Sequence, residues 1–172
     1  DFYYASPDVA NFQVYAVRPE LDSKNVRFLL TSSSPFPIPE LTSSQYSDVY
    51  SGGRWNLSVR VKPNKFPMTQ DVTGSSTTTY VVEFHGVNMI NGYAQNEFLL
   101  TSSMTQTEGE NFLKSAKRFY AGSHRQNFTA SLSDYQNIAA DALTDVSIGV
   151  VRYWASYLEQ DVINAHARDP SR

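Results

Sequence analysis

The chain has 172 residues and a formal net charge of −3, a size that suits a single domain. It has no cysteine, which excludes disulfides, Cys-ligated metals and Cys nucleophiles. No basic patch stands out, so we expect no nucleic-acid binding, and no apolar run approaches the length of a membrane span. We expect residues 1–172 to form one domain of a longer chain, because the sequence begins at Asp1 rather than Met.

The composition favours a β-rich domain. Aromatic residues make up 13% of the chain, and Ser and Thr are abundant, whereas charged residues make up only 18%. Aromatic and β-branched side chains suit pleated sheets, while Ser, Gly and Pro suit turns.

Two strands are predicted near the N-terminus, at residues 11–17 and 26–31. The first carries Phe12, Val14 and Ala16 on one face. Prolines then alternate through the first part of residues 32–50, which blocks a central strand and predicts an extended, exposed loop.

The clearest strand is residues 54–62, where apolar and polar side chains alternate strictly. We expect one set to point into the core: Trp55, Leu57, Val59 and Val61. We expect the other set to point outward: Arg54, Asn56, Ser58, Arg60 and Lys62.

A hairpin follows in the sequence. A strand is predicted at residues 78–88, and Asn91-Gly92, a common hairpin dipeptide, leads to a second strand at 96–104. In the first of these strands Tyr80, Val82 and Phe84 share one face, and Val81, Glu83, His85 and Val87 share the other.

The rest of the chain mixes both kinds of element. Residues 108–114 suggest a loop or a single helical turn, and 117–124 is a strand candidate that 126–132 could pair with. Residues 146–154 are predicted to form a long strand. Residues 155–168 are predicted to form a short amphipathic helix that Pro170 ends.

The end of the chain resembles the close of a laminin-G-like, concanavalin A-like jelly roll, whose last strand is followed by a short connection and an acidic helical turn. The matching residues are Val151, Arg152, Tyr153, Trp154, Leu158, Glu159, Asp161 and Ile163. Residues 53–61 are similar to the family's Gly-x-Trp entry into a central strand, and 119–128 to a late strand carrying a Gly. The resemblance spans about two-thirds of the chain, residues 52–166.

The resemblance implies an all-β fold, a jelly-roll β-sandwich with a short C-terminal helix. Such modules also occur in structural proteins of phages and other viruses and in extracellular proteins.

The family includes glycoside hydrolases that carry paired carboxylates on one strand, but Glu83 stands alone in its strand. His85 shares its face, so the two could form a hydrogen bond. We therefore expect no enzymatic activity.

The resemblance implies no required cofactor and a possible Ca²⁺ at the rim of the sandwich. Oxygen-bearing side chains in loops are the candidates: Asp71, Asn88, Asn91 and Asp134. Asn56 and Asn127 match the glycosylation pattern, which matters only for a secreted eukaryotic protein.

Exposed aromatic rings are the remaining candidates for function, since flat rings bind the apolar face of sugars while neighbouring polar groups form hydrogen bonds. The candidate ligand-binding residues are Trp154, Arg152, Tyr93, Tyr120, His124 and Arg125. Packing of Trp154 under the terminal helix is the alternative for that ring.

The sequence thus predicts a non-catalytic interaction module on an extracellular or virion surface. Its partner would be a glycan or a neighbouring protein subunit, the latter in a homo-oligomer or polymer. The alternatives are a purely structural subunit and a glycoside hydrolase or lyase of the same fold.

Overall fold

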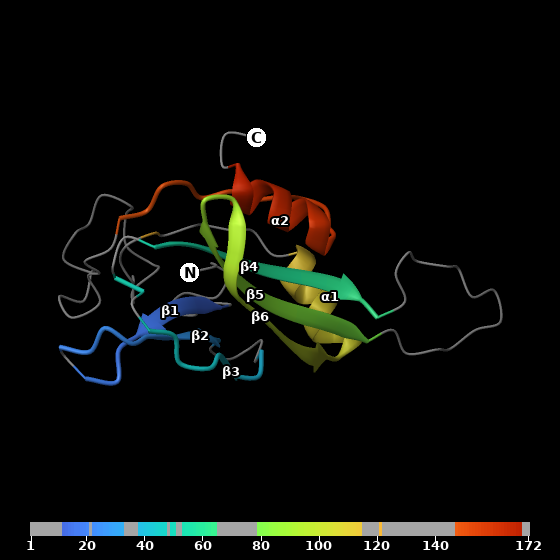
Figure 1. Cartoon of the computed structure of the whole chain (residues 1–172). Helices are drawn as coiled ribbons and strands as arrows, with labels where there is room; N and C mark the ends of the chain where they lie inside the picture. The colour runs from blue at the N-terminus through green and yellow to red at the C-terminus, as the bar shows by residue number, and fades with distance from the viewer. Residues whose placement is uncertain are drawn as a thin grey trace, which may run out of the picture.

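In the residues that it describes, the computed structural model contains two antiparallel sheets of three strands each and two short helices (Figure 1). The structure describes residues 12–20, 22–32, 38–47, 49–50, 53–64, 79–114, 121 and 147–169. Strands make up most of this regular secondary structure, consistent with the all-β class. The strand candidates at 117–124 and 126–132 lie outside the described residues, apart from Ala121.

The first sheet has the order β1-β2-β3. Its strands are β1 (Gln13–Val17), β2 (Arg27–Thr31) and β3 (Leu41–Thr42). The two N-terminal strands are confirmed. The short third strand lies in the region that the prolines predicted to be an extended loop, and it pairs with β2 at an edge of the sheet.

The second sheet has the order β4-β5-β6. Its strands are β4 (Arg54–Pro63), β5 (Tyr80–Ile90) and β6 (Tyr93–Met104). The predicted hairpin is confirmed: Asn91 and Gly92 both adopt positive φ, 53° and 82°. A two-residue turn of this type matches the right-handed twist of its strands and needs residues that tolerate positive φ.

One core joins the two sheets. Phe28 and Leu30 of β2 are buried together with Val82, Phe84 and Phe98 of the second sheet. Aromatic rings form its centre, with ring centroids 4.7 Å apart for Phe28 and Trp55 and 5.2 Å apart for Phe84 and Phe98. The predicted inner face of β4 packs against this core: Trp55, Leu57, Val59 and Val61.

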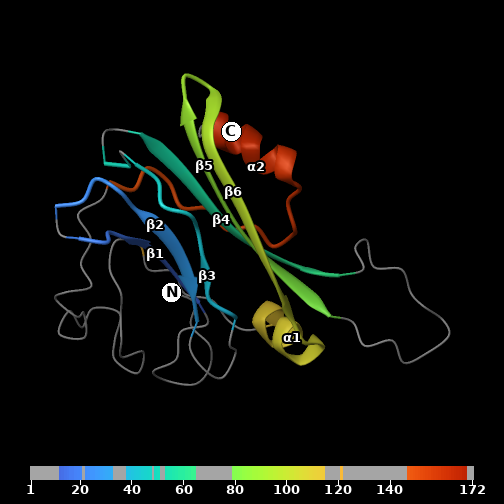
Figure 2. The same cartoon turned by 60° about the horizontal axis from the view of Figure 1, so that its bottom comes forward.

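The prediction that the other face of β4 points to solvent is wrong for Arg60, although Arg54 at the start of the strand is exposed. Arg60 is only 7% exposed, because the end of the chain crosses over this face (Figure 2). The same cover buries Glu83 and His85 on β5. Both faces of the central strand are therefore covered, one by the first sheet and one by the C-terminal segment.

Helix α1 (Gln106–Lys114) is longer than the single turn predicted. Its N-terminus has a capping box: the Thr105 backbone N–H donates to the Glu108 carboxylate at 2.8 Å, and the Glu108 N–H donates to Thr105 Oγ1 at 3.3 Å. Gly109 faces the Tyr80 ring so closely that a Cβ would lie 2.2 Å from a ring carbon. The glycine therefore lets α1 approach the sheet.

The predicted strand at 146–154 is wrong for its described part, because residues 147–154 have no strand structure and most of their side chains are exposed. An apolar run predicts a strand by its composition, but a strand needs backbone partners that composition does not supply.

The predicted terminal helix is confirmed in a shorter form, α2 (Gln160–Arg168). Ile163 and Ala167, four residues apart, are its buried side chains, whereas Val162 is 37% exposed. Leu158 lies before the helix and is partly buried, and Pro170 is outside the described residues. Neither described helix has the length and apolarity needed to cross a membrane.

Candidate functional site

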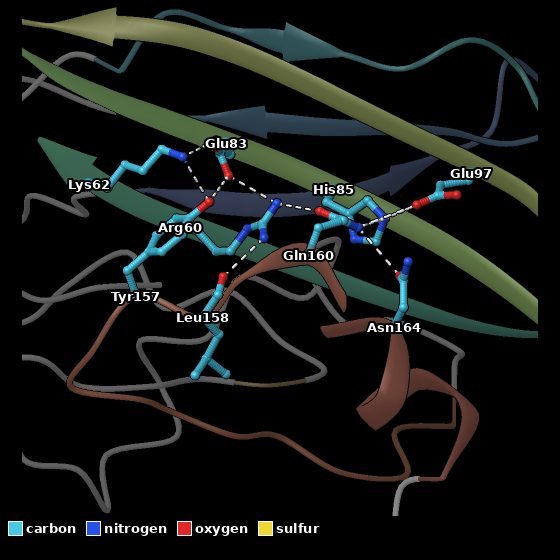
Figure 3. Close-up of polar contacts among 9 residues, drawn as sticks. All are labelled: Arg60, Lys62, Glu83, His85, Glu97, Tyr157, Leu158, Gln160 and Asn164. Carbon is cyan, nitrogen blue, oxygen red and sulfur yellow. Dashed lines mark hydrogen bonds and ion pairs between the residues drawn. The ribbon is translucent and has the colours of Figure 1, made fainter. Parts of the chain in front are cut away.

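The register of the second sheet gathers charged side chains on the face turned away from the core. Arg60 on β4 lies opposite Glu83 on β5, and Ser58 lies opposite His85. Glu97 projects from β6 on the same face (Figure 3). Side chains alternate between the two faces along each strand, and residues directly opposite each other on paired strands share a face. Once the strands are paired, these charged side chains therefore lie on the same face of the sheet.

Glu83 is the centre of a buried ion-pair network. Its carboxylate lies 2.9 Å from Arg60 Nη2 and 3.2 Å from Lys62 Nζ. The side chains of Arg60 and Glu83 are only 6% and 9% exposed. Removing Glu83 would leave the buried Arg60 charge without its carboxylate partner, and Lys62 would lose the same partner.

The segment before α2 lies over this face of the sheet and completes the network (Figure 3). The Tyr157 hydroxyl donates to Glu83 Oε2 at 2.8 Å and accepts from Lys62 Nζ at 3.1 Å. Arg60 donates to the Leu158 carbonyl at 3.1 Å. The hydrogen bond to Tyr157 and the Glu83 charge raise the pKa of Lys62, and burial raises the pKa of the Tyr157 hydroxyl.

Gln160 links this network to His85, which has no exposed surface. Arg60 Nη2 donates to Gln160 Oε1 at 2.6 Å. The amide nitrogen of Gln160 therefore faces His85 Nε2, at 2.7 Å, and Glu97 Oε1 lies 2.9 Å from the same ring nitrogen. Burial lowers the pKa of His85; the nearby Arg60 charge acts in the same direction, and the hydrogen bond to Glu97 opposes it.

This group of side chains, which we call the polar cluster, consists of Arg60, Lys62, Glu83, His85, Glu97, Tyr157 and Gln160. It contains acids, bases and hydrogen-bond donors. The C-terminal segment covers its centre, Arg60, Glu83 and His85, whereas the side chains of Lys62 and Glu97 at its edges are 27% and 44% exposed. Its hydrogen bonds to Tyr157, Leu158 and Gln160 fasten the C-terminal segment to the sheet.

The sequence singled out Glu83 and His85 as a pair on one face, and the structure gives them different partners: Glu83 binds Arg60 and Lys62, whereas His85 binds Gln160 and Glu97. The roles of Tyr157 and Gln160 were missed. The polar alternation of residues 54–62 was the available signal, because Arg60 and Lys62 face Glu83 as soon as the two strands pair.

Two of the predicted ligand-binding residues lie together against α2. The Trp154 ring stacks on His166 with centroids 5.1 Å apart, and Arg152 Nη1 lies 3.0 Å from His166 Nδ1. Packing of Trp154 against the terminal helix is thus confirmed, although the ring stays 45% exposed. Tyr93, 74% exposed, lies beside the hairpin turn on a different element. Tyr120, His124 and Arg125 lie outside the described residues.

Two of the four calcium candidates lie in the described part of the chain. Asn88 is buried and donates through Nδ2 to the Arg54 carbonyl at 3.0 Å, and Asn91 lies in the hairpin turn. In the part of the chain that the structure describes, no three His, Asp or Glu side chains are grouped to hold a metal ion. Asp71 and Asp134 lie outside that part, as does Asn127.

The shifted pKa of His85 predicts a pH dependence of stability. Folded His85 resists protonation, so below about pH 6.5, its ordinary pKa, the unfolded chain binds the extra proton. Stability should therefore fall as the pH drops through this range, by up to about 1.4 kcal/mol per pH unit for one proton, and level off below the folded pKa. Arg60, Glu83 and Glu97 are the charged groups near the ring.

Urea denaturation at about pH 7.5, 6.5 and 5.5 measures this slope. The control is His85→Gln, which keeps a polar side chain but does not titrate, and its slope over this interval should be smaller. Equal slopes in the two proteins would contradict the assignment to His85.

No protein-family model, no curated protein and no solved structure matches this chain.

Proposed function

We propose that this chain is a non-catalytic interaction module of a larger extracellular or virion surface assembly, and that its partner is a neighbouring protein subunit, in the first instance a second copy of itself. One observation carries the proposal: large apolar side chains are exposed within a short segment before α2. We call residues 148–154 the apolar strip.

The apolar strip combines aliphatic and aromatic residues in one stretch of backbone. Its exposed side chains are Ile148 (46%), Val150 (52%), Val151 (56%), Tyr153 (55%) and Trp154 (45%). Concentrated exposed apolar surface of this kind is typical of protein–protein contact sites. The strip contains no acidic residue and one cation, Arg152, which is bonded to His166. The surface that two copies of the strip would bring together is therefore mostly apolar.

The burial of the polar cluster supports a non-catalytic role. A general acid or base must reach the group it protonates or deprotonates. Glu83 and His85, the acid and base considered from the sequence, are 7% and 0% exposed and are engaged with partners inside the protein.

A concanavalin A-like jelly roll is the fold that we propose for the complete domain. Its support is the packing of two antiparallel sheets around one aromatic core and the resemblance in the last part of the sequence. The extracellular or virion location rests on that resemblance alone. The described strands form two meanders in chain order, whereas a jelly roll requires further strands that cross between the two sheets. An experimental structure of the whole domain tests the fold, and a domain without such crossings would contradict it.

Self-association is the expected result for the wild-type protein. Sedimentation velocity over a range of concentrations should show a species larger than a monomer, and the double substitution Val150→Ser/Val151→Ser should shift it to monomer. The matched control is Leu113→Ser, which changes a large apolar side chain 50% exposed on α1. A protein that stays monomeric at every concentration would contradict a homomeric role.

A glycan is the second candidate partner, favoured by the Trp154 ring, which His166 supports from one side while 45% of the residue stays exposed. A panel of oligosaccharides screened by calorimetry tests it. Binding that is lost in Trp154→Ala but kept in Val150→Ser/Val151→Ser would favour the glycan over the subunit.

A further inference from the structure

The C-terminal segment, residues 155–169, is held on the second sheet near both of its ends by arginines of β4. Arg60 donates to the Leu158 carbonyl at 3.1 Å (Figure 3), and Arg54 donates to the Ala167 carbonyl at 2.8 Å. The residues that these two contacts join are 98 and 113 positions apart in the chain. The outer face of β4 and β5 is therefore a docking surface for a piece of chain that is remote in the sequence.

The docked segment has few apolar anchors. Ile163 and Ala167 are the two buried side chains of α2, and Ala167 packs with Val87 and Met89 of β5. The contacts with the polar cluster are hydrogen bonds. Detaching the segment would thus expose little apolar surface and would return charged groups to water, which makes it a candidate for local opening.

The apolar strip leads directly into this segment. It has the β-branched and aromatic composition that favours strands, yet residues 147–154 have no strand structure. Its large apolar side chains are 45–56% exposed. One copy of the protein therefore leaves a strand-forming, apolar stretch exposed immediately before a segment that docks on a distant surface.

The strip alone is small for a stable interface. Specific interfaces involve roughly 20–30 residues on each side, whereas the strip, residues 148–154, has seven. The C-terminal segment contributes 15 more. Its contacts with the sheet are non-covalent, so the sheet of a second copy can form all of them, as in domain swapping. Exchange of the segment would thus give the interface the usual size.

We propose that, when the protein self-associates, each copy docks its C-terminal segment on the second sheet of the other copy. The inference rests on the proposed function, because it requires contact between two copies at the apolar strip. Arg60 of one copy then donates to the partner's Leu158 carbonyl, and the other contacts of the segment pass between the copies in the same way. A two-fold axis that crosses the two strips makes them antiparallel, an arrangement in which they can pair as strands.

The exchange keeps the contacts of the polar cluster and adds the burial of the apolar strip. Its cost is the lost independent motion of the two copies, so the dimer fraction should rise with protein concentration. In Val150→Ser/Val151→Ser the apolar gain is removed while the docking contacts remain. We therefore expect that variant to be a folded monomer whose segment docks on its own sheet.

Engineered cysteines test the exchange, because the chain has none of its own. Met89→Cys and Ala167→Cys, which change two residues of one buried cluster, are co-expressed as full-length chains with different tags and then oxidised. A disulfide should join the two different chains, in a yield that follows the dimer fraction measured by sedimentation velocity. The negative control replaces Met89→Cys by Ser103→Cys, on the exposed face of β6, and should give little cross-linking. The positive control places both Met89→Cys and Ala167→Cys in one chain, which should cross-link internally in the dilute monomer.

A second measurement uses the wild-type protein without cysteines. Isotope-labelled and unlabelled chains are unfolded and refolded together, and filtered NMR spectra are recorded at a concentration where the dimer dominates. Contacts between the Ala167 methyl group of one chain and the Val87 methyl groups of the other are expected. A dimer without these contacts would overturn the exchange and leave self-association intact. A protein that stays monomeric at every concentration would contradict the proposed function as well.

Discussion

Replacing Glu83 by alanine should lower the free energy of unfolding by about 3–5 kcal/mol, the cost of breaking a buried ion pair by removing one partner. Arg60, with a side chain 6% exposed, loses the carboxylate 2.9 Å away, and Lys62 loses its partner at 3.2 Å. Tyr157 also loses the acceptor of its hydroxyl. Urea denaturation followed by tryptophan fluorescence measures the loss.

The matched control is Glu110→Ala on α1. This carboxylate also forms an ion pair, with Lys114 at 2.8 Å, but the lysine side chain is 74% exposed. Surface pairs contribute little, so the midpoint should change much less than in Glu83→Ala. Equal effects of the two substitutions would contradict the central role of Glu83.

A second substitution separates an ion-pair requirement from a packing requirement. In Arg60→Met/Glu83→Leu both charges are replaced by apolar side chains, and such replacements are often neutral or stabilising. We expect this double variant to be more stable than Glu83→Ala. If it is equally unstable, the network is needed for its hydrogen bonds to Leu158 and Gln160 rather than for charge balance.

Gly86→Ala should also destabilise the domain, by about 1–3 kcal/mol, the usual cost of overpacking a core. Gly86 is on β5 and lies between side chains of the two neighbouring strands. An added Cβ would be 2.3 Å from the Phe98 ring on β6 and 2.9 Å from a Leu57 methyl group on β4. The Phe98 ring has little room to move, since it stacks on Phe28 with centroids 5.7 Å apart and meets the edge of Phe84. Thermal denaturation followed by circular dichroism measures the effect.

Two further variants identify the cause of that effect. Gly149→Ala, at a position with no atom within 4 Å of an added Cβ, should be neutral or slightly stabilising. Gly86→Ala/Phe98→Leu should recover part of the loss that Gly86→Ala causes, because the smaller side chain makes room for the methyl group. No recovery would indicate that the glycine is required for backbone reasons instead.

The sequence by itself determined the elements whose signals are local. The nine-residue alternation in residues 54–62 predicted β4 and its core-facing side chains, and Asn91-Gly92 predicted the hairpin turn with positive φ at both positions. The helical spacing near the C-terminus predicted α2, although not its start. These features depend on neighbours a few residues away, and periodicity records such neighbours directly.

Only the tertiary structure decided what lies on the second face of the sheet. Arg60 has the polar character of a solvent-facing residue, yet it is buried because Leu158, 98 residues further along the chain, lies over it. The apolar run before α2 has the composition of a strand, yet residues 147–154 are not a strand and leave most of their side chains exposed. Alternation distinguishes two faces, but which face is covered depends on contacts between distant segments, and no local pattern in the sequence encodes those contacts.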